Sequence, residues 1–84
     1  MDIQRVVRDL VTTKRNSWLA SKSLRVVEDA SGTLSVALDP VGCKPGDFVI
    51  TMGGTAARLA TDNPKIITDL TIGGIIDHWS EDDW

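Results

Sequence analysis

Turn-forming residues interrupt this sequence so often that only short elements fit between them. Prolines and glycines mark a loop at 39–46, paired glycines stand at 53–54 and 73–74, and residues 29–32 have the composition of a tight turn. The segments between these turns are rich in β-branched and other apolar residues, which favour strands. This pattern limits the chain to a fold of short strands with little room for helix.

The clearest strand pair flanks the turn at 29–32. Leu34, Val36 and Leu38 alternate with smaller or polar residues, so we expect this strand to have one buried and one solvated face. The spacing within residues 3–13 would also suit a helix, but its β-branched content favours a strand. Strands are therefore expected at 3–13, 24–28, 33–38, 47–52 and 71–78.

The glycine pair at 53 and 54 lies between a buried strand and a short predicted helix. Adjacent glycines allow a sharp turn or a close backbone approach, and Thr55 can cap a helix that continues through Ala56 and Ala57. Free N–H groups at such a helix start can receive an anion, and the same unit repeated around an axis can line a hole. Turns of this kind that bind no ligand and have no catalytic role are also common.

The length of 84 residues allows one small hydrophobic core. We expect a single domain over residues 1–79 and a short acidic tail over residues 80–84. Five short strands, with one short helix before the last, predict an all-β fold of the OB-like five-stranded barrel type.

Composition argues against several classes of protein. Hydrophobic residues make up 42% of the chain and charged residues 25%, and no apolar stretch is long enough to span a bilayer. The first residues lack the order of a signal peptide, and the lone Cys43 cannot form an internal disulfide, which fits a reducing cytoplasm. A net charge of −3 argues against a nucleic-acid partner. We expect neither a membrane nor a nucleic-acid partner.

Charge is unevenly distributed along the chain. Most basic residues fall in the first third, whereas the end is acidic and carries no lysine or arginine. Two solvated faces would explain this, and so would a basic edge that meets the acidic edge of a neighbouring copy in a ring.

No residue pattern predicts catalysis, a metal site or a cofactor. His78 is the single histidine, and no nucleophile, base and orienting group can be placed together from the sequence. No His, Cys or carboxylate cluster has the spacing of metal ligands. The rival to a structural role is an OB-like binding or adaptor module for single-stranded nucleic acid or a protein partner, but aromatic residues are not interleaved with basic ones as stacking on single strands requires.

Three segments in order carry a family resemblance. Residues 44–49 (KPGDFV), 53–58 (GGTAAR) and 72–77 (IGGIID) resemble the pentameric vertex proteins of bacterial microcompartment shells. Residues 68–79 are similar to the α-carboxysome branch of that family, and within it to the second of two paralogues. The resemblance covers nearly the whole chain except the tail.

The resemblance implies a function as well as a fold. Five copies would form a homopentamer that caps the vertices of an icosahedral shell, in contact with hexameric shell proteins and in some shells with a paralogous vertex protein. The chain would then be a non-catalytic component of the carboxysome shell in the cytoplasm, supporting CO2 fixation. A small central pore for anions such as bicarbonate would be lined by Gly53, Gly54, Thr55, Ala56 and Ala57. Arg58, Ile75, Ile76 and Asp77 would support the pore or the subunit interface.

The chain departs from the family pattern in a few places. Thr55 stands where serine is more usual, residues 16–19 replace a loop that more often carries Pro-Gly, and the tail ends in Trp84. Trp79 and Trp84 with the acidic tail can be interpreted in two ways. Either they form a docking patch, or Trp79 is partly buried and Trp84 is frayed at the chain end, which is the more common arrangement.

Overall fold

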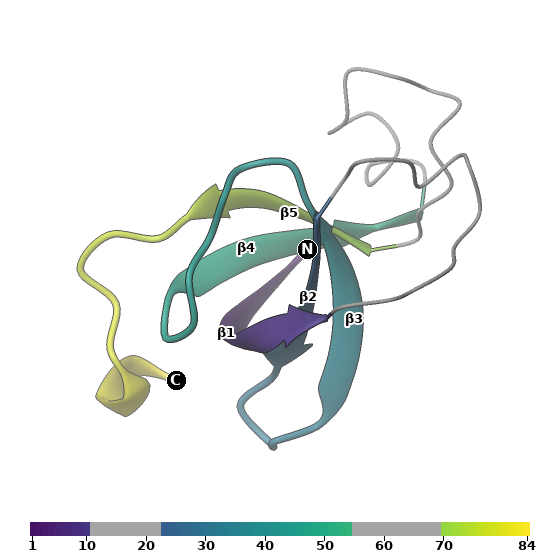
Figure 1. Cartoon of the computed structure of the whole chain (residues 1–84). Coiled ribbons are helices and arrows are strands. Elements are labelled where there is room, and N and C mark those ends of the chain that lie inside the picture. The colour runs from purple at the N-terminus through teal and green to yellow at the C-terminus, as the bar shows by residue number, and fades with distance from the viewer. Residues whose placement is uncertain (11–22, 55–69) are drawn as a thin grey trace.

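The computed structural model describes residues 1–10, 23–54 and 70–84 and shows a small closed β-barrel (Figure 1). Around the barrel the strands follow the order β1-β2-β3-β5-β4, and all neighbours are antiparallel except the parallel pair β3 and β5. The predicted all-β five-stranded barrel is confirmed. The strands are β1 (Asp2–Leu10), β2 (Ser23–Glu28), β3 (Leu34–Asp39), β4 (Phe48–Gly53) and β5 (Leu70–Ile75).

Element boundaries differ from the expected ones mainly at the end of β5. This strand stops at Ile75, whereas the sequence predicted extension to His78. The amide of Ile76 still donates to the carbonyl of Phe48, the first residue of β4, so beyond this point β4 offers no further partner. The short helix expected after Thr55 lies outside the described residues, and the helical segment that the structure describes is the 3-10 turn η1 (Glu81–Asp83).

Inward-facing side chains from all five strands fill the barrel. Val6, Val27, Val49 and Ile72 are almost completely buried and form one cluster with Ala37 and Cys43. Two polar side chains also point inward, where the Thr51 hydroxyl donates to Oε1 of Gln4 at 2.6 Å. Because these two groups satisfy one another, their burial is tolerated.

The predicted faces of β3 are partly wrong. Leu38 is buried, but Leu34 and Val36 are 52% and 47% exposed, while Ala37, which follows Val36, belongs to the core cluster. The predicted alternation holds only in the first half of the strand, because Ala37, Leu38 and Asp39 are all buried. A strand has only two faces, so a pattern that gives the period does not say which face meets the core.

A β-bulge accounts for the second glycine pair. Ile50 lies opposite Gly74 and Thr51 opposite Ile72, so Gly73 is the extra residue on β5. A Cβ atom at Gly73 would lie 2.4 Å from the terminal carbon of Met52, whereas one at Gly74 would meet nothing within 4 Å. The glycine pair at 73–74 therefore marks a bulge rather than a turn, and the close contact concerns Gly73 alone.

Candidate functional site: the ends and outer faces of the barrel

The glycine pair at the end of β4 is exposed. Gly54 has a φ of 59°, a left-handed conformation in which a residue with a side chain is strained, although a Cβ there would meet nothing within 4 Å. The glycine is therefore required by the backbone turn rather than by crowding within the chain. The other predicted pore residues, Thr55, Ala56 and Ala57, lie outside the described residues, as does Arg58.

The predicted residues Ile75, Ile76 and Asp77 lie at the opposite end of the β4–β5 ladder from the glycines. Gly53 is opposite Leu70, whereas Ile75 is opposite Val49, four residues back along β4. At a rise of about 3.3 Å per residue, this separation is about 13 Å. Within one chain the structure therefore does not bring the two groups of predicted site residues together. Ile75 and Asp77 are exposed and Ile76 is half-buried.

A buried carboxylate, that of Asp39, lies at the end of β3. The amides of Val41, Gly42 and Cys43 donate to Asp39 at 3.0, 2.8 and 2.7 Å. Arg25 forms ion pairs with Asp39 and with Asp9, each at 2.9 Å. Asp39 therefore fixes the loop that follows β3 and places Cys43 in the core.

Sequence reasoning missed the role of Asp39. Burial by itself would raise the pKa of this carboxyl, but the hydrogen bonds from the amides of Gly42, Cys43 and Val41 outweigh it and hold the pKa below its ordinary value. An aspartate directly before a Pro-x-Gly turn is a recognisable signal for such a carboxylate, because aspartate accepts hydrogen bonds from amides further along a turn.

Cys43 should be chemically inert in the folded chain. Burial, followed by the nearby charge of Asp39, raises the pKa of its thiol from 9.0 to about 12. The reactive thiolate is then about a thousandfold scarcer at pH 8 than for an ordinary cysteine. We expect iodoacetamide to modify the protein quickly in urea but very slowly in native buffer, as followed by mass spectrometry. Rapid modification of the folded protein at pH 8 would show that the 39–46 loop opens.

The outside of the barrel carries two separate apolar surfaces. The first, the β3 surface, consists of Leu34 and Val36. The second, the β1–β4 surface, is a groove along the outer sides of β1 and β4 and the segment after β5, where Ile3 of β1 lies directly opposite Ile50 of β4. The apolar residues that line it are Met1, Ile3, Ile50, Ile76 and Trp79.

The two apolar surfaces lie on opposite sides of the molecule. In the closed order β1-β2-β3-β5-β4, β1 and β4 are neighbours, and β3 is two positions away from each of them. In a five-stranded ring this is the greatest separation possible. One chain therefore presents apolar side chains in two opposite directions.

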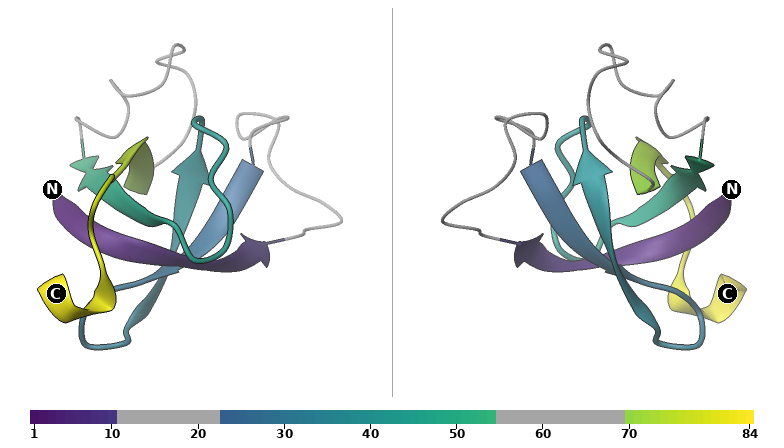
Figure 2. Two further views of the ribbon diagram at one scale, coloured as in Figure 1. Left: turned by 90° about the vertical axis from the view of Figure 1, so that its left-hand side faces the viewer. Right: turned by 90° about the vertical axis from the view of Figure 1, so that its right-hand side faces the viewer.

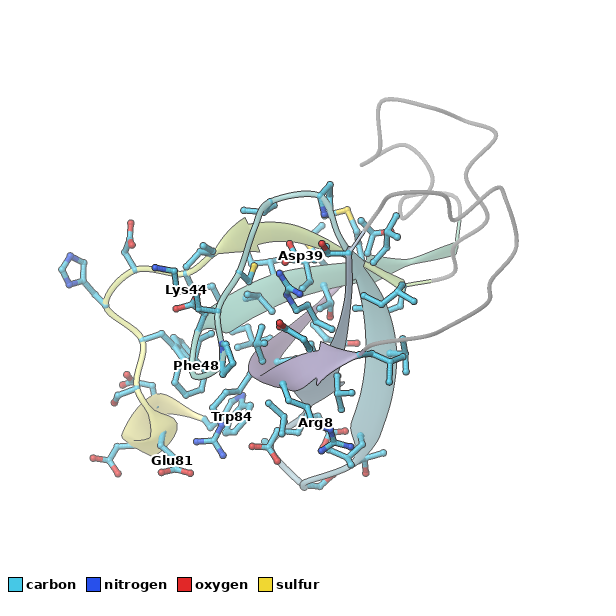
Figure 3. All side chains as sticks on the ribbon, in the orientation of Figure 1. Arg8, Asp39, Lys44, Phe48, Glu81 and Trp84 are labelled. Carbon is cyan, nitrogen blue, oxygen red and sulfur yellow. The ribbon has the colours of Figure 1, made fainter. Side chains whose placement is uncertain are left out.

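A third feature brings the C-terminus back to the barrel. Figure 2 shows the C-terminal segment leaving β5 and running past β1, and Figure 3 shows Trp84 beside Phe48. The two rings are 5.2 Å apart, edge to face, and Nη1 of Arg5 donates to Glu81 at 3.2 Å. The expectation of a frayed Trp84 is wrong. Part of the negative charge of the tail is therefore paired with a cation of the same chain, which the distribution of charge along the sequence did not indicate.

Residues 1–10, 23–54 and 70–84 contain no group of three or more His, Cys, Asp or Glu side chains that could hold a metal ion. Among the same residues, no helix is long and apolar enough to cross a bilayer.

Comparison with known proteins shows the class of protein to which the barrel belongs. A family model described as ethanolamine utilisation protein EutN/carboxysome matches residues 1–77. The carboxysome shell vertex protein CsoS4B of Halothiobacillus neapolitanus is 53% identical over 79 residues, which cover 94% of this chain and 98% of the relative. CsoS4A of Prochlorococcus marinus is 50% identical over 82 residues, covering 98% of this chain and 92% of the relative.

Solved structures agree with the sequence matches. The structure of CsoS4B from Halothiobacillus neapolitanus superimposes with a TM-score of 0.87 at 52% identity, covering 92% of this chain and 99% of the other. The GrpN pentameric microcompartment shell protein from Rhodospirillum rubrum gives a TM-score of 0.77 at 28% identity and covers 95% and 99%. The barrel is thus of the class found in microcompartment shell vertex proteins. The chain belongs to the EutN/CcmL family, and the predicted family resemblance is confirmed.

Proposed function

We propose that this chain is a structural, non-catalytic vertex protein of the α-carboxysome shell, and that it closes the shell in the cytoplasm and so supports CO2 fixation. The observation that carries the proposal is the similarity to CsoS4B, 53% identical over nearly the full length of both chains. The chain also matches CsoS4A relatives at up to 52% identity, so the identities alone do not separate the two paralogue types. The resemblance of residues 68–79 to the second paralogue favours that type.

The two apolar surfaces support a ring of five copies. A ring is built from head-to-tail contacts, in which one surface of each subunit meets a different surface of the next. The β3 surface and the β1–β4 surface are distinct, apolar and on opposite sides of the barrel. Pairing them from chain to chain buries Leu34 and Val36, whose exposure is otherwise unfavourable for a small domain.

In this proposal, the predicted pore residues lie at the axis of the ring. Gly53 and Gly54 are exposed and without side chains, so five copies can approach one another closely there, followed by Thr55, Ala56 and Ala57. Arg58 supports the pore or pairs with an acidic edge of the neighbour. Because Ile75, Ile76 and Asp77 lie about 13 Å from the glycines along the ladder, we assign them to subunit contacts. Unimpaired bicarbonate flux through shells with a blocked Gly54 opening would refute the anion pore.

The outward faces of the ring would contact hexameric shell proteins, and a paralogous vertex protein would share some vertices. Native mass spectrometry of the purified chain tests the ring first. We expect one species at five times the chain mass of 9.1 kDa. A stable monomer at every concentration would contradict the ring and favour the OB-like binding module instead.

A further inference from the structure

The last five residues fold back on the barrel as a self-capped turn. The amide and hydroxyl of Ser80 donate to Oδ2 of Asp83 at 2.8 and 3.1 Å and so close η1. Trp84 follows and packs edge to face on Phe48 at an interplanar angle of 83°. The family model ends at residue 77, so this segment lies beyond the part of the chain that defines the family.

The barrel surface that receives the tail is held in place without it. Arg5 points outward from β1, and its Nε and Nη2 atoms both donate to Oε1 of Glu28 on β2. The guanidinium carbon lies 5.9 Å from the ring centre of Phe48 and 5.6 Å from that of Trp84. Arg5, Glu28 and Phe48, here called the tail site, therefore offer a fixed cation beside an aromatic ring. That combination recognises a carboxylate together with an aromatic side chain.

The docked tail is easy to release. None of the residues of η1 is buried, and the side chain of Glu81 is 71% exposed. The segment also reaches the tail site through His78, whose φ of 57° is a left-handed conformation that costs free energy for a residue with a side chain. Docking is thus favoured by the contacts of Trp84 and Glu81 and opposed by the backbone at His78.

We propose that the tail site is a peptide-binding site for acidic segments that carry an aromatic residue, and that residues 80–84 occupy it as a releasable latch. The tail itself shows the chemistry of the ligand, because Glu81 meets the cation of Arg5 and Trp84 meets Phe48. Any other segment must displace this resident occupant. The tail therefore raises the apparent dissociation constant, which equals the intrinsic value divided by the fraction of chains whose tail is released.

A synthetic peptide of sequence Ser-Glu-Asp-Asp-Trp with a free carboxyl terminus and a 5-fluorotryptophan tests the site by fluorine NMR. Contacts of the size made by Trp84 predict that full-length Trp84→Ala binds the peptide about tenfold more tightly than the wild type. We expect the dissociation constant of the free peptide to be in the millimolar range. A tail on a short tether has an effective concentration of that order, so a weak contact is enough for it to dock. Adding Arg5→Gln to Trp84→Ala should abolish binding of the peptide. Trp84→Phe keeps an aromatic ring on the tail, so its tail should again compete with the peptide for the tail site.

Three results would overturn the proposal. These are absence of binding to Trp84→Ala at about 10 mM peptide, equal affinity for Trp84→Ala and wild type, and binding that survives Arg5→Gln. A second variant leaves the tail site and the tail intact. His78→Val places a β-branched residue at a positive φ, so it should release the latch and raise peptide affinity severalfold. Unchanged affinity, with the circular dichroism spectrum of the wild type, would show that His78 is not the hinge.

Discussion

Replacing Val36 with glutamate is expected to convert the assembly into folded single chains. The side chain is 47% exposed on the outer face of β3, so a charge is tolerated in the free barrel but not in an apolar contact between barrels. An uncompensated carboxylate at each of five contacts should weaken each by a hundredfold or more. Native mass spectrometry measures the change, and circular dichroism shows whether the barrel is intact. Val41→Glu is a matched control, because Val41 is 46% exposed but belongs to neither apolar surface.

Mixing two variants tests the head-to-tail arrangement directly. Ile3→Glu disables the β1–β4 surface and Val36→Glu disables the β3 surface, so neither variant alone can build a ring. A mixture keeps one intact contact, in which the β3 surface of the first variant meets the β1–β4 surface of the second. We expect a one-to-one heterodimer that grows no further. A mixture that remains monomeric, or a ring formed by either variant alone, would contradict the pairing of these two surfaces.

The barrel could be predicted from the sequence because its signals are local. Turn residues at 29–32, 39–46 and 53–54 separate short β-type runs, and five such runs in a chain of this length leave few alternatives to a closed sheet. Which face of a strand points inward is not a local property. Leu34 and Val36 are exposed although both are larger than Ala37, which the same strand contributes to the core, since a chain that assembles has apolar outer surfaces as well as an apolar core.

The features missed at the candidate sites depend on contacts between distant parts of the chain. Arg5 and Glu81 are 76 residues apart, and Trp84 contacts Phe48 after a segment that contains the left-handed residue His78. Nothing in the residues around Trp84 distinguishes a docked chain end from a frayed one. The glycine turn at 53–54, in contrast, is visible in the sequence because a positive φ at Gly54 selects the residue type locally.

Asp39→Asn is expected to lower the free energy of unfolding by about 3 kcal/mol, the largest loss among the single substitutions considered for stability. Asp39 is only 5% exposed, accepts three backbone amides and faces Arg25. An asparagine can accept at one oxygen only, turns an NH2 group toward amide donors, and leaves the arginine paired with Asp9 alone. Asp9→Asn is the matched control. It removes the other partner of Arg25, but at a side chain 59% exposed, and should cost less than about 1 kcal/mol.

Urea unfolding at several pH values measures both variants, on the Val36→Glu background so that unfolding is not coupled to dissociation. Because the pKa of Asp39 is lowered in the folded chain, its ionised form stabilises the fold fully above the ordinary aspartate value of about 4, and this contribution is lost as the pH falls through the lower folded pKa. The gap between parent and Asp39→Asn should therefore be full at pH 7 and narrow below about pH 4. A gap independent of pH would mean that the amide hydrogen bonds, rather than the charge of Asp39, hold the loop after β3 in place.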